Sequence, residues 1–304
     1  MRCCTVIVNP KAGNGKALGL LSIVEAKLRE RGYDVSTEYT RMVGDGTRIA
    51  QLVPHASTVV ALGGDGTLNE IINGLPQGCL LAIVPGGSGN DLIKSLPIPN
   101  NPIQALAWAL QGKPRKLDVG VISCGRIDEN GQEVLETSER MFINGAGVGF
   151  DAAVAVRKGE IKYLTGTPVY LAAVLLTLGS YKAPLFEIQA DGVSRSSKNL
   201  LIAIGNGRCA GGGFYLTPEA DPADGKLDVC LIDDISIPTI FGLMPRVMLG
   251  RHLTHRNVTY TKTNEVKLRS ESRFFIHADG EIVGHGVEFM RVKVRPQYVS
   301  VLGG

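Results

Sequence analysis

The fold is indicated most directly by the stretch Ala61–Glu70, whose sequence is ALGGDGTLNE. A short apolar run, Thr58–Leu62, leads into its glycines, and the segment Glu70–Gly74 begins a helical pattern. We therefore expect a strand, a glycine turn and the N-terminus of a helix. The glycines leave room for a phosphate group and permit positive φ angles, so that backbone N–H groups can point into one concavity. The helix N-terminus adds further N–H donors and a positive dipole end.

An acidic residue, Asp65, lies within this turn, although the N–H groups of the turn are suited to bind an anion. A carboxylate is unfavourable there for simple anion binding, but it is expected where a cation such as Mg²⁺ accompanies the phosphate. The alternative is an ordinary tight turn in which Asp65 acts as a local cap. The strand before the turn and the helix after it favour the phosphate-binding interpretation.

Two more glycine turns occur where a strand gives way to a helix. The strand Thr5–Val8 leads into the loop Asn9–Lys16, and the apolar run Cys79–Val84 leads into Pro85–Leu92. The first loop is not a P-loop, because the spacing G-x-x-x-x-G-K-[ST] is absent. The carboxyl ends of parallel strands meet at one edge of a sheet, where ligands bind. Three glycine turns at that edge are more informative than any one of them.

The order of predicted elements indicates two domains. Strands alternate with helices up to about residue 110, which predicts an α/β nucleotide-binding domain with a parallel sheet over residues 1–120. Strands then dominate, apart from one helical island at Ala152–Leu178, and predict an antiparallel β-sandwich over residues 121–295. The final segment, 296–304, is expected to return to the first domain. The strand candidates of the second domain are Val119–Cys124, Arg140–Asn144, Phe186–Ala190, Leu200–Gly205, Leu227–Ile232, Asn257–Thr261, Glu265–Leu268, Phe274–Ala278 and Glu288–Val294.

Composition restricts the class of protein. Of the 304 residues, 44% are apolar and 20% charged, which is typical of a packed globular chain. The net charge of +3 and the lack of a dense Lys/Arg run argue against nucleic acid as a partner. Six scattered cysteines without a C-x-x-C pair indicate reduced thiols in a cytoplasmic protein. The most apolar helix candidate, Val169–Leu178, is shorter than the ~20 residues that span a bilayer, so membrane contact is at most peripheral.

Motifs along the whole chain carry a family resemblance. In the first domain and near the C-terminus they are NPKAG at Asn9–Gly13, GGDGTLNE at Gly63–Glu70, PGGSGND at Pro85–Asp91 and DGE at Asp279–Glu281. In this order they resemble the soluble bacterial lipid kinases of the diacylglycerol kinase catalytic-domain family, relatives of the sphingosine kinases. This chain also resembles the second domain of the bacterial members, in the segments Asn206–Arg208, Gly211–Gly213 and Asp224–Asp228. The sequence GGDGT alone is shared with NAD kinases and phosphofructokinases, but the full ordered set is more specific.

The resemblance implies a kinase that passes the γ-phosphoryl group of ATP to a lipid hydroxyl, with diacylglycerol, which gives phosphatidic acid, as the leading acceptor. It implies Glu281 as the general base, with Asp279 beside it. It implies nucleotide contacts at Asn9, Thr40, Gly64, Asp65, Gly66, Thr67, Leu68, Asn69, Glu70 and Ser88. Ser88 stands where some relatives have threonine, and the hydroxyl is kept.

The resemblance also implies a structural Mg²⁺ in the second domain, around Asp224. Main-chain oxygens near Asp221 and Lys226 are expected to contribute to it. His277 precedes Asp279 by two residues and faces the same side of a strand, but a structural histidine is the more common case.

Access to a lipid requires an apolar surface, and two segments that mix basic and apolar residues are candidates for it: Lys158–Leu178 and Ile237–His255. They predict peripheral contact with the inner face of the membrane, although core-packed helices would show the same composition.

Three other functions remain open at this stage. The same machinery serves another lipid acceptor, namely phosphatidylglycerol, a sphingoid base or a polyprenol. An NAD kinase shares the main glycine loop, but the pairing of Ser88–Asp91 with Asp279–Glu281 speaks against it. A lipid or nucleotide sensor would bind without turnover, and an intact Glu281 argues against that. The sequence leaves open whether the protein forms a homodimer.

Overall fold

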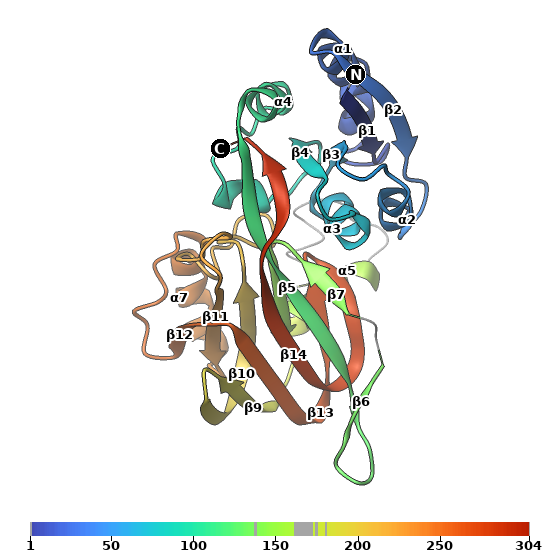
Figure 1. Cartoon of the computed structure of the whole chain (residues 1–304). Coiled ribbons are helices and arrows are strands. Elements are labelled where there is room, and N and C mark those ends of the chain that lie inside the picture. The colour runs from blue at the N-terminus through green and yellow to red at the C-terminus, as the bar shows by residue number, and fades with distance from the viewer. Residues whose placement is uncertain (1, 137–138, 161–172, 174–175, 180, 304) are drawn as a thin grey trace. The chain divides into compact units, whose positions relative to one another are not determined.

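The computed structural model describes the chain over residues 2–136, 139–160, 173, 176–179 and 181–303 (Figure 1). The chain forms two compact units. Unit 1 consists of Met1–Val119, Pro222–Gly225 and Arg295–Gly304, and unit 2 of Gly120–Asp221 and Lys226–Val294. Each unit is thus built mainly from long continuous stretches of chain.

Unit 1 contains a parallel sheet. Its strands are β1 (Arg2–Val8), β2 (Tyr33–Tyr39), β3 (Thr58–Gly63) and β4 (Leu80–Pro85). They lie in the order β4-β3-β1-β2, and the end of β14 (Glu281–Leu302) adds a parallel strand beside β4, with Ser300 opposite Leu80. The near-continuous apolar runs of β3 and β4 are buried on both faces, as in other parallel sheets.

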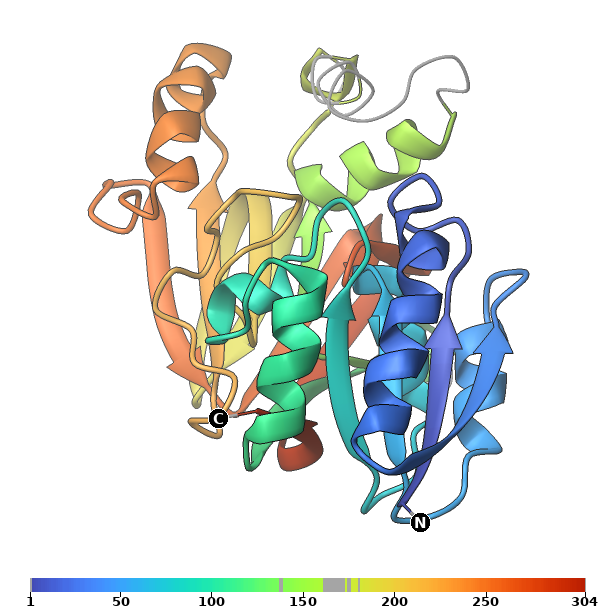
Figure 2. The same ribbon diagram turned by 90° about the horizontal axis from the view of Figure 1, so that it is seen from above.

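Helices cover both faces of this sheet (Figure 2). The helices are α1 (Lys16–Glu30), α2 (Asp45–Gln51), α3 (Asp65–Gly74) and α4 (Pro102–Gln111), with a 3₁₀ turn, η1 (Leu92–Ser95). The first and fourth helices pack into one apolar cluster with β1, β3 and β4, and α2 and α3 lie together on the other face. The start of helix α4 is capped by Asn101, whose side chain accepts hydrogen bonds from the N–H groups of Ile103 and Gln104.

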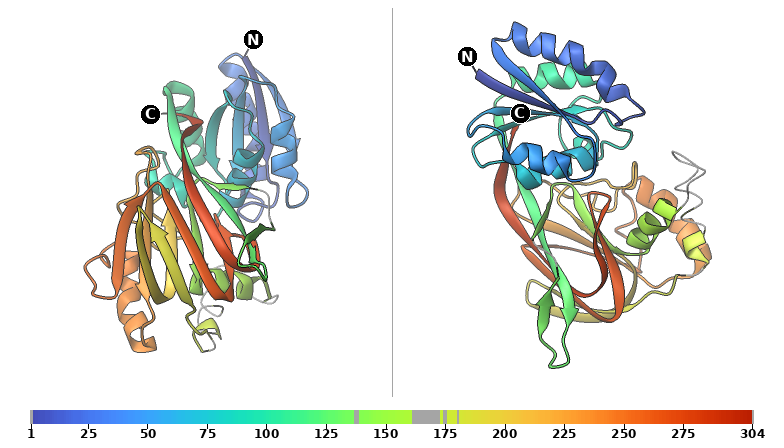
Figure 3. Two further views of the ribbon diagram at one scale, coloured as in Figure 1. Left: turned by 60° about the horizontal axis from the view of Figure 1, so that its bottom comes forward. Right: turned by 90° about the vertical axis from the view of Figure 1, so that its right-hand side faces the viewer.

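Unit 2 is built from antiparallel strands. They are β5 (Pro114–Ile127), β6 (Glu133–Leu135), β7 (Arg140–Phe142), β8 (Gly145–Gly149), β9 (Leu185–Ala190), β10 (Val193–Gly205), β11 (Leu227–Asp233), β12 (Val258–Thr263), β13 (Glu265–Ala278) and the first part of β14. The hydrogen-bonded order is β12-β11-β10-β8-β13-β14; β9 also pairs with both β10 and β13, and β5 pairs with β6, β7 and β14 (Figure 3). Two helices, α5 (Phe150–Glu160) and α7 (Ile237–Met248), also belong to this unit. Side chains of these strands form one large apolar cluster, and the other face of β10 and β11 packs in a second cluster with α7.

One sequence-based expectation for unit 2 differs from the structure. The strand candidates Glu265–Leu268 and Phe274–Ala278 are one strand, β13, with an irregularity between Arg269 and Phe274. A second irregularity lies inside β14, where Gly286 takes a φ of +65° and the register with β13 shifts. Irregular pairing of this kind interrupts the alternation on which strand prediction depends. Of the predicted helical island, α5 is described and residues 161–172 lie outside the described ranges.

Two negative findings concern the described part of the chain. No helix within it is long and apolar enough to cross a membrane. None of the cysteines, all of which are described, forms a disulfide, and all except Cys3 are buried. The expectation of reduced, mostly buried thiols is therefore confirmed.

Candidate functional site

The three glycine loops of unit 1 meet at one edge of its sheet, as predicted. The carbonyl oxygen of Gly63 accepts the N–H groups of Gly86 and Gly87 at 2.7 and 3.0 Å. A Cβ atom on Gly87 would lie 2.4 Å from the Cα of Gly64, and one on Gly13 would lie 2.3 Å from the carbonyl oxygen of Gly86. The loops after β1, β3 and β4 therefore touch through their backbones, and side chains at these positions would separate them.

The reason for the glycines in the central loop differs from the one expected. Positive φ angles occur in the first loop, at Gly13, Asn14 and Gly15, but not at Gly63, Gly64 or Gly66. Gly64 is extended, with φ −106° and ψ −167°, and α3 starts directly after it at Asp65. The expected use of positive φ and the expected helix start near Glu70 were wrong. Close approach of neighbouring backbones, rather than a left-handed conformation, requires glycine here.

Asp65 connects the second and third glycine loops. Its Oδ1 accepts the N–H of Asp91 at 2.7 Å, and a Cβ on Gly89 would lie 2.8 Å from its Oδ2. The Asp91 carboxylate in turn pairs with Lys94 at 2.6 Å. The position of Asp65 in the first turn of α3 also suits a negative charge, because the helix dipole is positive there. Asp65 thus holds the central loop against its neighbour.

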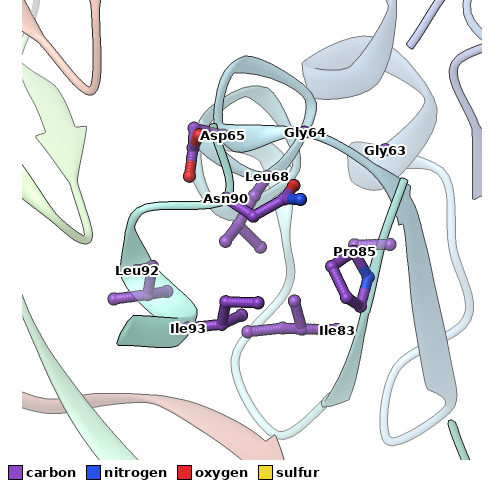
Figure 4. A pocket seen from close by; sticks show the side chains of 10 residues that line it. Gly63, Gly64, Asp65, Leu68, Ile83, Pro85, Asn90, Leu92 and Ile93 are labelled. Carbon is purple, nitrogen blue, oxygen red and sulfur yellow. The ribbon is translucent and has the colours of Figure 1, made fainter. Parts of the chain in front are cut away.

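A small pocket lies beneath these loops (Figure 4). It is lined by Ala61, Gly63, Gly64, Asp65, Leu68, Ile83, Pro85, Asn90, Leu92 and Ile93. In Figure 4, Asp65 and Asn90 lie above it and the aliphatic side chains of Ile83 and Ile93 below it. Its volume of about 10 Å³ is room for about one water molecule. The pocket is therefore the tightly packed floor of the loop cluster, and it is too small for a nucleotide.

Three of the expected nucleotide contacts, Asn9, Thr40 and Thr67, make hydrogen bonds near the carboxyl ends of β1, β2 and β3. The Asn9 side chain donates its Nδ2–H to the Thr67 hydroxyl at 3.1 Å. The Thr67 side chain occupies the space that a Cβ on Gly63 would need. The N–H of Thr40 donates to the carbonyl oxygen of Val8, which places Thr40 next to the end of β1. These residues lie at the same sheet edge as the glycine loops.

Other expected contacts differ from one another in exposure. Ser88 is exposed at the tip of the third loop, whereas Leu68 and Asn69 are buried. Glu70 is buried too, and its carboxylate accepts the N–H groups of Gly44 and Gly46 at 2.8 and 2.7 Å. Both oxygens of Glu70 are thus used to hold the N-terminus of α2 against α3. This arrangement supports the loop from beneath.

In unit 2, the DGE motif forms a tight hairpin turn between β13 and β14. Asp279 and Gly280 have φ angles of +49° and +88°, and Ala278 pairs with Glu281 across the turn. Two consecutive positive φ angles are the signature of a type I′ turn, for which Asp-Gly is a preferred sequence.

The Asp279 carboxylate fixes the position of this turn. It accepts the N–H groups of Ile143, Asn144 and Gly145 at 3.0, 3.0 and 2.9 Å. The Asp279 N–H also donates to the carbonyl oxygen of Gly145. Asp279 therefore ties the hairpin to the segment between β7 and β8.

Glu281 is the first residue of β14 and remains accessible. Its side chain is 31% exposed, and its Oε2 lies 3.1 Å from Nη2 of Arg140. The arginine orients the carboxylate without covering it. A carboxylate placed directly after a rigid turn is suited to accept a proton from a bound alcohol.

The structure adds a pair that sequence reasoning missed. His277 Nε2 lies 2.9 Å from Asp151 Oδ2 in α5, and the two side chains are only 12% and 14% exposed. A Cβ on Gly147 would collide with both of them, so the glycine makes their contact possible. Burial opposes the protonated ring, but the charge and hydrogen bond of Asp151, with the charge of Asp279, outweigh it and raise the pKa of His277. No local pattern predicts this pair, because its members lie 126 residues apart.

The raised pKa of His277 makes stability depend on pH. Since the pKa is higher in the folded state, the pair stabilises the fold fully below the unfolded value of about 6.5, and this contribution is lost as pH rises through the folded pKa. We expect the Tm difference between the wild type and His277→Asn to be largest near pH 6 and to shrink towards pH 9. Thermal unfolding across this range measures it, with the exposed His55→Asn as control. A Tm difference that does not change with pH would contradict the assignment.

The segment expected to bind a metal includes the turn Pro222–Gly225, which belongs to unit 1 and is held in place by Asp118. The buried Asp118 accepts the N–H groups of Gly225 and Gln297 through its two oxygens, both at 2.7 Å. Its own N–H donates to the carbonyl oxygen of Pro222. Asp224 is exposed within this turn.

The donors expected around Asp224 are oxygens, which suit Mg²⁺. Asp221 and Lys226 flank the turn and are half-buried. Among the residues described, no group of three or more His, Cys, Asp or Glu side chains is arranged to hold a metal ion. A site at Asp224 would therefore have to combine its carboxylate with main-chain oxygens, which are ligands of the kind that Mg²⁺ prefers.

Comparison with family models covers both units. A model described as "Diacylglycerol kinase catalytic domain" matches residues 4–122. A second, described as "YegS C-terminal NAD kinase beta sandwich-like domain", matches residues 145–303, which is more than half of the chain.

Individual proteins match over nearly the whole length. A protein of Bacillus subtilis (strain 168) named diacylglycerol kinase is 28% identical over 291 residues, 93% of this chain and 91% of that protein. One of Staphylococcus aureus (strain bovine RF122 / ET3-1) with the same name is 28% identical over 285 residues, 92% and 86% of the two chains.

Solved structures confirm the fold class. A diacylglycerol kinase crystal structure from Bacillus anthracis str. Sterne covers 100% of this chain and 97% of its own, with TM-score 0.71 at 20% identity. Yeast NADH kinase complexed with NADH covers 100% and 84%, with TM-score 0.56 at 11% identity. An α/β unit joined to a β-sandwich unit is the fold that they share with this chain.

Proposed function

Since the chain belongs to the diacylglycerol kinase family of ATP-dependent lipid kinases, we propose that its acceptor is diacylglycerol and its product phosphatidic acid. ATP is the co-substrate, and the acceptor group is an alcohol. The choice of diacylglycerol depends on one observation. The two relatives compared above carry that name and align with more than nine-tenths of this chain.

In our proposal, the glycine loops of unit 1 bind the phosphates of ATP. Their contact through bare backbone at Gly64 and Gly87 supports this, because phosphate oxygens need close access to N–H groups. Ser88 is exposed at the tip of the third loop and is proposed to donate its hydroxyl to the nucleotide. Asn9, Thr40 and Thr67 are proposed to complete the contact, and Leu68, Asn69 and Glu70 to support the loop from beneath.

Glu281 is proposed as the general base. The acceptor hydroxyl oxygen attacks the γ-phosphorus, the bond to the β–γ bridging oxygen breaks, ADP leaves, and the hydroxyl proton passes to the Glu281 carboxylate. Arg140 supports this role because its Nη2 lies 3.1 Å from Oε2 of Glu281 and orients the carboxylate. Asp279 is proposed as a positioning residue, since its oxygens accept three backbone N–H groups and fix the turn that carries Glu281.

Mg²⁺ is proposed in two places. With ATP, it would neutralise the charge that develops on the transferred phosphoryl group. Asp65, on the first turn of α3, is the carboxylate that we propose for this ion. A second, structural Mg²⁺ is proposed at Asp224, with main-chain oxygens near Asp221 and Lys226, because the Asp118 carboxylate holds this turn by the N–H of Gly225.

A lipid acceptor also implies contact with a membrane surface. We propose that this contact is peripheral and occurs at the cytoplasmic face, where ATP is available. The homodimer stays a prediction.

The acceptor is tested by γ-phosphate transfer from labelled ATP with Mg²⁺. The panel contains mixed micelles of diacylglycerol, phosphatidylglycerol, sphingosine and a polyprenol, together with NAD in solution. We expect label only in phosphatidic acid. Label in another lipid would replace the proposed acceptor, and labelled NADP would favour the NAD kinase alternative, to which the fold of yeast NADH kinase lends support. Binding of ATP without any labelled product would favour a sensor.

A further inference from the structure

Helix α7 exposes apolar side chains on the outside of unit 2. Ile237, Phe241, Met248 and Leu249 are 46%, 49%, 50% and 67% exposed. Figure 1 shows the helix beside β11 and β12, and Figure 2 shows it projecting beyond these strands. Pro238, Gly242 and Pro245 are exposed as well. Single exposed apolar side chains are common, but a group of large ones on one element indicates an interaction site.

The packing of α7 does not explain this exposure. Its core contacts are made by Ile240, Leu243 and Val247, which are buried in a cluster with side chains of β10 and β11. At 100° per residue, Ile237, Phe241 and Met248 form a separate stripe, away from the buried one. A surface helix that only covers a core has polar residues on its outer side. Helix α7 carries apolar side chains on its exposed surface as well as on its buried one.

From its first residue onward, α7 and the segment after it carry only basic charged side chains, while Asp233 and Asp234 lie just before the helix. From Ile235 to Asn264 the sequence contains neither aspartate nor glutamate. The same segment carries Arg246, Arg251 and Arg256, all exposed. Exposed apolar side chains bordered by arginines are complementary to anionic lipid head groups above acyl chains.

We propose that α7 docks this lipid kinase on an anionic bilayer. Phe241, Met248 and Leu249 enter the boundary between head groups and acyl chains, and Arg246 and Arg251 contact lipid phosphates. The proposal rests on the lipid kinase activity and not on which lipid is the acceptor. It gives the enzyme a defined surface through which it reaches a substrate that stays in the membrane.

Sedimentation with vesicles tests the apolar part. We expect the triple variant Phe241→Ser/Met248→Ser/Leu249→Ser to bind vesicles of phosphatidylcholine and phosphatidylglycerol about tenfold more weakly than the wild type. Activity on short-chain diacylglycerol in detergent micelles should be unchanged. The matched control is Met42→Ser/Val43→Ser/Leu52→Ser, whose side chains in unit 1 are 72%, 87% and 75% exposed. Wild-type vesicle binding by the α7 variant would overturn the proposal.

The arginines give a second measurement. We expect Arg246→Glu/Arg251→Glu to weaken binding to the anionic vesicles, most strongly at low salt, and to leave the weak binding to pure phosphatidylcholine unchanged. Equal losses on both vesicles would contradict a role in head-group contact. Light scattering of both variants in solution tests the other occupant, a second copy of this chain. A dimer that becomes a monomer in the α7 variant would replace the bilayer as the partner.

A fluorescent variant replaces one exposed aromatic side chain by another and therefore disturbs the helix little. The chain has one tryptophan, Trp108, in α4, so Phe241→Trp adds a single indole on the proposed surface. We expect brominated acyl chains to quench the added fluorescence, while Leu52→Trp in unit 1 is not quenched. Absence of quenching in the bound protein would overturn the proposal. If no lipid is phosphorylated but quenching occurs, the docking surface stands and the proposed acceptor fails.

Discussion

Replacement of Glu281 by glutamine is expected to lower kcat for lipid phosphorylation by about 10²–10⁴-fold. The amide keeps the size of the side chain but cannot take the proton of the acceptor hydroxyl. The change should leave ATP affinity within about twofold of the wild type, because the loss of a base acts on chemistry rather than on binding. It should also leave Tm close to the wild-type value, since the side chain is partly exposed and sits at the start of a strand. Steady-state kinetics and ATP titration measure these effects.

The matched control is Glu271→Gln, which removes an exposed carboxylate from the neighbouring strand β13. We expect its kcat to equal that of the wild type. The pH profile gives an independent reading, because loss of the base should remove the acidic limb of the kcat profile in Glu281→Gln. Turnover of Glu281→Gln within tenfold of the wild type would remove Glu281 from the mechanism.

The second large effect is expected from Gly87→Ala in the third glycine loop. The added methyl group would lie 2.4 Å from the Cα of Gly64 and 3.0 Å from the side-chain oxygen of Asn90. The backbones of the second and third glycine loops cannot accommodate the methyl group without moving apart. Overpacking of this kind typically lowers the free energy of unfolding by about 1–3 kcal/mol. We expect ATP affinity to fall by at least about tenfold and Tm to decrease. Calorimetric titration with a non-hydrolysable ATP analogue and a thermal scan measure both quantities.

Gly19→Ala is the control for this change. Gly19 lies within α1, and no atom is close to the position that its Cβ would take. Alanine is the better helix former by about 1 kcal/mol, so this variant should bind ATP normally and be equally or more stable. If Gly87→Ala bound ATP as tightly as the wild type, the contact between the loops would not be part of the nucleotide site.

The sequence predicts the strand and helix order of unit 1 well, and the reason is local. Each strand is a short apolar run, and each strand end is marked by glycines, so the loops after β1, β3 and β4 can be recognised without tertiary information. Their convergence then follows from parallel topology. The DGE turn is local as well, since Asp279 and Gly280 prefer the positive φ angles that a two-residue hairpin requires.

The parts that sequence reasoning missed depend on contacts between distant residues. Asp65 accepts the N–H of Asp91, Glu70 accepts two N–H groups near α2, and His277 meets Asp151. In each case an acidic side chain that resembles a ligand or a cap is bound to a partner that no short pattern reveals. Backbone N–H groups are especially difficult to foresee as partners, because every residue except proline carries one. Sequence motifs therefore predict the position of the site better than the role of each side chain within it.

Strand β14 has a consequence for the order in which the protein acquires its structure. It begins with Glu281 and ends beside β4, where Ser300 pairs with Leu80 across most of the chain. A ribosome releases β4 long before it releases this partner, so the growing chain carries an open strand edge during most of synthesis. Pairing between such distant residues is slow to form. The parallel sheet of unit 1 is therefore completed only after the strands of unit 2 have been synthesised.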